Sequence, residues 1–86
     1  MNSKKKDIEQ LKKNDRLVEK LSKSINNLNN MIGNAYDSKG EFYLMKGDID
    51  MAMSMWKKVM EYDNKNLEFY KQNSALYKQL KVKGYL

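Results

Sequence analysis

The side chains best suited to chemistry in this 86-residue chain are carboxylates, serines and lysines, because the sequence contains neither histidine nor cysteine. Without these two residue types there is no imidazole base, no thiol nucleophile and almost no ligand set for a transition metal. The carboxylates do not cluster as in a metal-binding loop, no glycine-rich phosphate cradle follows a strand, and no base accompanies the serines. We therefore expect no enzymatic activity, no metal and no cofactor.

Lysine is the dominant charged residue, since sixteen of the seventeen basic side chains are lysine and the net charge is +6. Residues 1–23 carry eight basic and four acidic groups, and residues 71–86 carry four lysines and no acid. A small nucleic-acid-binding protein is therefore one hypothesis, because basic chain ends attract phosphates. The alternative is that the lysines and ten asparagines reflect AT-rich codons and form solvated helix faces.

Helices must position these side chains, because proline is absent, glycine occurs four times and 33% of the residues are charged. In the first third of the chain, apolar residues recur at spacings of three and four, which predicts an amphipathic helix with one narrow stripe. The stripe consists of Ile8, Leu11, Val18, Leu21, Ile25, Leu28 and Ile32. Asp15 and a three-residue irregularity interrupt a coiled-coil pattern, so we expect this helix to pack against the rest of the chain. The absence of a long apolar run near the start predicts a cytoplasmic protein without a membrane span.

Gly47 and Asp48 predict the clearest helix boundary, because glycine suits the left-handed residue after a helix and aspartate caps the next one. One helix should end just before this pair, and a second should span about residues 49–62. The second helix is apolar on most of its faces, so it must be packed between neighbours. Asn66 is expected to cap a last helix that runs to about Leu80. No segment alternates strictly enough to form a strand.

A pattern of aromatic and small residues begins at Gly33 and occupies thirty-four residues. It reads Tyr36-x2-Lys39-Gly40-x2-Tyr43, then Ala52-x3-Trp56, then Asn64, and Tyr70, Ser74 and Tyr77 repeat its beginning thirty-four residues later. This pattern resembles a tetratricopeptide repeat, a helix-turn-helix unit of that length. In such a unit, Gly40 and Ala52 would let the two helices approach closely. Lys39 and Asn64 depart from the large apolar residue and the proline of the family.

The resemblance implies an all-α, tetratricopeptide-like fold in three parts. Residues 1–32 form an N-terminal amphipathic helix, residues 33–66 an antiparallel helix-turn-helix, and residues 67–86 a capping helix with a basic tail. Repeat units need about three copies to bury a core. Because the chain holds fewer, we expect self-association or an obligate partner. The microtubule-interacting-and-trafficking domain, which has three helices, is a further candidate for the fold.

In the tetratricopeptide family, the inward face of the first helix lines a groove for a peptide or a partner helix. The resemblance therefore implies partner-binding residues at Asn34, Asp37, Ser38, Glu41, Leu44 and Met45, continued by Glu68, Lys71 and Ala75 on the last helix. The acids at 37 and 41 favour an apolar segment that carries a basic residue. Met51 and Met55 lie away from the stripe of Met53 and Trp56, so we expect the N-terminal helix or another chain to cover them. The expected function is that of a non-enzymatic adaptor, scaffold or small chaperone.

Overall fold

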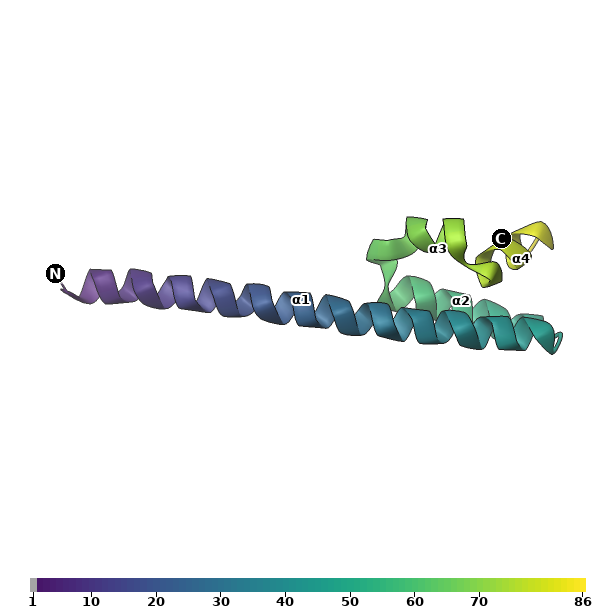
Figure 1. The fold of residues 1–86 in the computed structure, drawn as a ribbon, viewed down its shortest axis with the longest axis horizontal. Helices are drawn as coiled ribbons and strands as arrows, with labels where there is room; N and C mark the ends of the chain where they lie inside the picture. The colour runs from purple at the N-terminus through teal and green to yellow at the C-terminus, as the bar shows by residue number, and fades with distance from the viewer. Residues whose placement is uncertain (1) are drawn as a thin grey trace.

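The computed structural model describes the backbone of residues 2–86 and the side chains of residues 7–86. This part of the chain is all-α, as expected from the sequence, and measures 69 × 18 × 16 Å. Its elements are α1 (Asn2–Met45), α2 (Ile49–Tyr62), the short 3-10 helix η1 (Asn64–Asn66), α3 (Leu67–Asn73) and α4 (Ala75–Val82). One end of α1 projects far beyond the other helices (Figure 1). We call residues 7–28 of α1 the stem and residues 29–86 the head.

α1 is one uninterrupted helix of 44 residues, so the boundary expected between residues 32 and 33 falls inside it. Nothing in this segment stops a helix, because proline is absent and the adjacent asparagines at 29 and 30 are compatible with helical backbone. Gly33 and Gly40 each disfavour a helix by about 1 kcal/mol relative to alanine. Both are buried by the C-terminal part of the chain, and this packing offsets the cost.

The predicted boundary at Gly47 is confirmed. Gly47 has a φ of 81°, and the Asp48 N–H donates to the Tyr43 carbonyl oxygen at 2.9 Å, which closes α1 with the hydrogen bonds of a glycine-terminated helix. The Asp48 carboxylate then accepts from the Met51 N–H at 3.1 Å and caps α2. The resulting tight turn places α2 antiparallel to α1.

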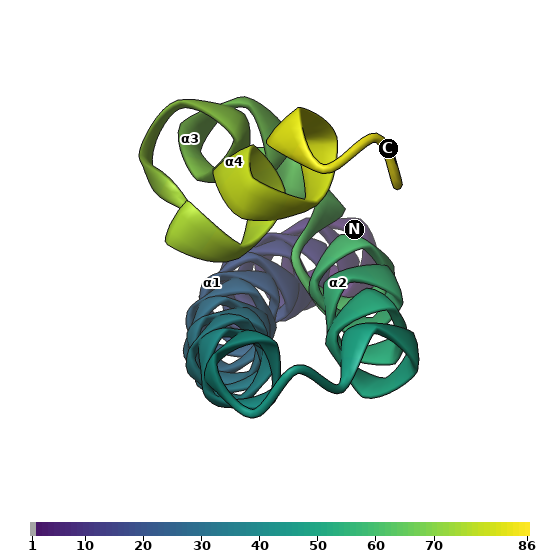
Figure 2. The ribbon, with the colours of Figure 1, turned by 90° about the vertical axis from the view of Figure 1, so that its right-hand side faces the viewer.

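The core lies where α2, α3 and α4 meet the last third of α1 (Figure 2). Its fully or nearly buried side chains are Ala52, Met55, Trp56, Val59, Tyr70, Leu76 and Leu80. The placement of Met55 corrects the expectation from sequence, because Met55 shares the buried face of α2 with Trp56 whereas Met53 is only half-buried. One side of α2 carries the four buried residues 52, 55, 56 and 59. The small residue on this side, Ala52, allows close packing.

The last helix is not continuous, in contrast to the single helix expected from Asn66 to Leu80. It breaks at Ser74, whose extended backbone separates α3 from α4. The Ser74 hydroxyl accepts from the Tyr77 N–H at 3.1 Å, which caps α4, and donates to an oxygen of Asp37 on α1. A serine inside a helical pattern thus acts as a cap and anchors the chain to α1.

The stem does not pack against the rest of the chain, so that expectation was wrong. All side chains of residues 7–28 are exposed, including every apolar residue of the stripe. Because α1 is straight and unbroken, it carries residues 7–28 away from α2, α3 and α4 (Figure 1).

Candidate interaction surfaces

Two glycines of α1 determine how the C-terminal segment crosses it. A Cβ at Gly40 would overlap the side chain of Leu76 on α4, and a Cβ at Gly33 would lie 2.7 Å from both the Cβ of Asp63 and the hydroxyl of Tyr70. Gly40 therefore admits α4, whereas the sequence had assigned it to the contact between the two helices of a hairpin. The interval of seven residues places both glycines on the same side of α1.

The buried carboxylate of Asp63 joins α1, α2 and α3. It accepts hydrogen bonds from the amide of Asn30 at 2.9 Å, the amide of Asn66 at 2.8 Å and the hydroxyl of Tyr70 at 2.7 Å. The Asn34 amide in turn donates to the Asn30 side chain at 3.2 Å. Burial of the carboxylate is tolerated because each oxygen has a donor.

Burial and the hydrogen bond to Asp63 raise the pKa of Tyr70 well above its ordinary value of 10. The hydroxyl therefore stays protonated and donates to the carboxylate over the whole physiological range. This network holds the start of α3 against α1, and among the described residues no buried side-chain nitrogen or oxygen lacks a partner. Its function is structural, and sequence reasoning missed it because Asp63 appeared only as a turn residue.

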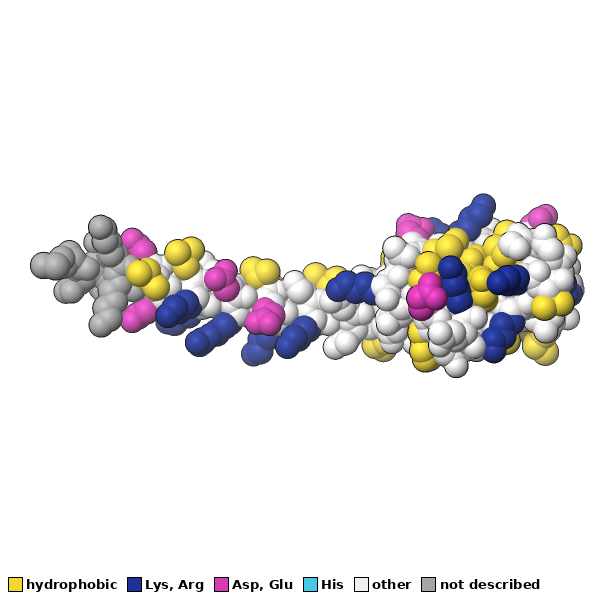
Figure 3. All heavy atoms as spheres, turned by 90° about the horizontal axis from the view of Figure 1, so that it is seen from above, with side chains coloured by type: hydrophobic (Ala, Val, Ile, Leu, Met, Phe, Trp, Pro, Cys, Tyr) yellow, Lys and Arg dark blue, Asp and Glu magenta, His cyan; other side chains and the backbone are white. Residues whose placement is uncertain are grey.

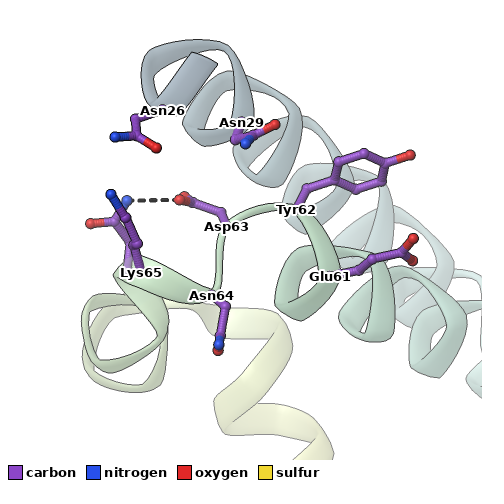
Figure 4. A pocket seen from close by; sticks show the side chains of 8 residues that line it. Asn26, Asn29, Glu61, Tyr62, Asp63, Asn64 and Lys65 are labelled. Carbon is purple, nitrogen blue, oxygen red and sulfur yellow. Dashed lines mark hydrogen bonds between the residues drawn. The ribbon is translucent and has the colours of Figure 1, made fainter. Parts of the chain in front are cut away.

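A polar hollow of about 200 Å³ lies where the stem meets the head. Figure 4 shows Asn26 and Asn29 of α1 on one side of it and the loop of Asp63, Asn64 and Lys65 on the other. The free part of α1 ends at this hollow, since the exposed side chains of the stem give way to half-buried ones at residue 29.

An apolar groove of about 220 Å³ lies between α1 and α4 at the far end of the head. Four of the residues expected from the repeat resemblance line it, namely Glu41, Leu44, Met45 and Ala75, together with Gln79. The groove is short, so it accommodates a few side chains rather than the length of a helix.

The other expected partner-binding residues are placed elsewhere. Asn34 and Asp37 are engaged by hydrogen bonds within the head, and the expectation that Asp37 presents a free carboxylate is therefore wrong. Lys71 is half-buried, and its Nζ lies 3.8 Å from a carboxylate oxygen of Glu68. Met55 is buried in the core, so it is not part of any partner surface. The remaining two, Ser38 and Met51, are exposed on α1 and α2.

The stem has two chemically distinct sides. Six apolar side chains, each 53–62% exposed, follow one another along it: Ile8, Leu11, Val18, Leu21, Ile25 and Leu28. We call these six residues the stem stripe. Lys13, Arg16, Lys20 and Lys23, spaced three or four residues apart, form a basic face on the side away from the stripe. Figure 3 shows the row of apolar groups and the basic groups gathered along one edge.

Comparison with known protein families, with curated proteins and with solved structures gives no match to this chain. Among the described residues, no helix is both long enough and apolar enough to cross a membrane. Over the same residues, histidine, cysteine and carboxylate side chains nowhere gather in a group of three that would hold a metal ion. The candidate interaction surfaces are therefore the apolar groove and the two sides of the stem.

Proposed function

We propose that this protein is a non-enzymatic protein–protein interaction module that binds another α-helix along the stem stripe. The observation that carries the proposal is the exposure of the six stripe residues, each with more than half of its surface in water. Burial of a whole leucine or isoleucine side chain contributes about 1.5–3 kcal/mol, so covering the exposed half of each contributes about 1 kcal/mol. A second helix laid along the stripe supplies this burial over its full length.

The instability of an unsupported helix supports the same proposal. Helices gain most of their stability in water from packing of an amphipathic face, and isolated ones remain marginal even at about 15 residues. The stem is longer than this, yet every side chain of residues 7–28 is exposed, so its apolar stripe is not packed against the rest of the chain. A partner on the stripe would therefore stabilise the helical state of the stem as well as bind to it.

The resemblance to a tetratricopeptide repeat remains part of the proposal. It is supported by the helix-turn-helix of α1 and α2 with its turn at Gly47, and by the burial of Ala52 and Trp56. The head also differs from the pattern, because α1 alone is longer than the thirty-four-residue unit and the following helix breaks at Ser74. We propose a repeat-like hairpin that carries a binding stem, in place of a repeat that binds through its inner groove.

A comparison of two double variants tests the proposed function. Val18→Ser with Leu21→Ser alters the stem stripe, and Lys20→Ser with Lys23→Ser makes a matched change on the basic face. Each tagged protein is cross-linked in its native cell, and the captured proteins, including other copies of the chain, are quantified by mass spectrometry. We expect the stripe variant to lose about tenfold or more of the specific capture, and the control to retain it. Equal capture by all three proteins would contradict the proposal.

The basic face supports a second candidate function, the binding of nucleic acid. Four basic side chains on one side of an exposed helix match the charge of a phosphate backbone, although lysine recognises it as a point charge without sequence readout. An electrophoretic mobility shift with duplex DNA and with RNA tests this candidate. A shift that persists at about 200 mM salt would support it, because nonspecific lysine contacts weaken strongly at that concentration.

A further inference from the structure

We propose that the helix bound by the stem stripe belongs to a second copy of this chain, which runs antiparallel to the first, with the two-fold axis at Val18. This inference rests on the proposed function and adds the identity and direction of the partner. Four observations support it: the spacing of the stripe, the position of Asp15, the location of the head and the length of the free stem.

The spacing of the stem stripe reads the same in both directions. From Ile8 to Leu28 the stripe positions, with Asp15 included, are separated by 3, 4, 3, 3, 4 and 3 residues, and Val18 is the centre of this series. Two antiparallel copies aligned at Val18 therefore place residue 8 opposite 28, and 11 opposite 25. The two consecutive three-residue steps on either side of Val18 would disturb pairing with a regular heptad helix. In the antiparallel pair, these steps of one copy lie opposite the same steps of the other.

Asp15 distinguishes the two possible directions of the partner. A parallel pair in register would bring two Asp15 carboxylates together in an apolar seam, and like charges at close range are unfavourable. In the antiparallel pair, Asp15 lies opposite Leu21 of the other copy. The two carboxylates are then six residues apart along the helix axis, or about 9 Å.

The head occupies the space that a parallel partner would need. Beyond Leu28 the apolar series of α1 continues to Ile32 and Tyr36, and the ring of Tyr36 stacks on Tyr62 of α2 at 5.7 Å between centroids. The chain's own α2 thus covers the continuation of the stripe at Tyr36. In a parallel pair, both heads would compete for the same place beside the two helices. In the antiparallel pair, they lie at opposite ends.

The length of the free stem matches the paired segment. Residues 8–28 span about 30 Å of helix, and the exposed part of α1 ends at the polar hollow lined by Asn26 and Asn29. An antiparallel copy aligned at Val18 brings Ile8 opposite Leu28, so the paired stripe ends at this hollow. The two copies bury twelve stripe residues, and both contribute the same surface, as a two-fold interface requires.

Single-cysteine variants test the inference cleanly, because the natural chain contains no cysteine. The variants are Ile8→Cys, Leu28→Cys, Val18→Cys and, as a control on the basic face, Lys20→Cys. Each is oxidised alone, and the first two are also oxidised after mixing. We expect disulfide-linked dimers from Val18→Cys and from the mixture, at a level at least about tenfold above that of Ile8→Cys alone or of the control.

Three outcomes would overturn the inference. Efficient linkage of Ile8→Cys to itself would indicate a parallel pair. A wild-type chain that sediments as a monomer up to about 100 µM would exclude self-pairing. Binding of that monomer to vesicles of phosphatidylcholine and phosphatidylserine would assign the stripe to a lipid surface. If the chain is monomeric while capture in cells still depends on the stripe, the proposed function stands and only the identity of the partner fails.

Discussion

The two ends of α1 show what the same kind of sequence does with and without neighbours. In the head, Gly33 and Gly40 admit the C-terminal segment, and aromatic side chains fill the space beside α2. In the stem, apolar residues recur at similar spacing, yet their side chains remain exposed. Apolar spacing therefore predicts which side of a helix is buried but does not identify what buries it. The apolar face of the head is covered within the chain, whereas the stem stripe stays exposed and is the surface that we propose another helix covers.

Removal of the central aromatic side chain should affect the head more than any other single change. Trp56 is 2% exposed and packs against Tyr77 at 5.1 Å between ring centroids. We expect Trp56→Ala to lower the free energy of unfolding by about 3–5 kcal/mol, which is most of the stability of a domain this small. Urea unfolding followed by circular dichroism measures the change. Phe69→Ala, at a side chain that is 59% exposed, is the control and should cost far less.

The crossing of α4 over α1 should be nearly as sensitive. Gly40→Ala introduces a Cβ that overlaps Leu76, so we expect a loss of about 1–3 kcal/mol in the free energy of unfolding. Ser38→Ala, on an exposed side of the same helix, should change it by less than about 0.5 kcal/mol. Thermal melts of both variants provide the measurement. Equal melting temperatures for Gly40→Ala and Ser38→Ala would mean that α4 does not pack against Gly40.

Alkaline pH should destabilise the head through Tyr70. Its pKa is raised in the folded chain, so above pH 10 an unfolded tyrosine loses its proton while the folded one keeps it. The unfolded state then binds fewer protons, and the free energy of unfolding falls by up to about 1.4 kcal/mol per pH unit. Unfolding curves between neutral pH and pH 11 measure this slope. Tyr70→Phe should remove that part of the slope, and Tyr85→Phe, at a half-exposed residue, should leave it unchanged.

A polar residue in the stem stripe should have the smallest effect on the head. Leu21→Ser changes a side chain that is 53% exposed and remote from the core, so the unfolding of the head should shift by less than about 0.5 kcal/mol. The helical signal of the stem and its dependence on protein concentration should fall instead, because both rely on a covered stripe. Circular dichroism over a dilution series measures this, with Lys20→Ser as the control. A large change in the free energy of unfolding of the head would contradict the distinction between the stem and the head.

The sequence correctly predicted those helix boundaries that depend only on neighbouring residues. The turn at Gly47 and the cap at Asp48 follow from the preferences of those two residues. The break at Ser74 was missed because, although the cap on Tyr77 is local, the Ser74 hydroxyl is also anchored to Asp37, thirty-seven residues away. The buried carboxylate of Asp63 was missed for the same reason, since its partners come from two different helices.

The candidate site was predicted only in part. Glu41, Leu44 and Met45 do line a groove with α4, but Met55 is buried in the core and the half-buried Asp37 accepts a hydrogen bond from Ser74. The apolar stripe was recognised from its spacing, whereas its exposure depends on the straight course of α1. A periodic pattern cannot reveal whether the chain turns back on itself, since that depends on contacts distant in sequence.

The unbroken course of α1 also sets a length. In an antiparallel pair centred on Val18, the start of each head at Asn29 is eleven residues from the axis, so the two heads are held about 33 Å apart along the paired helices. In such a pair, the distance between the two heads would be fixed by the helical rise. Only the addition of whole turns to the helix would change this distance and keep the apolar residues in register.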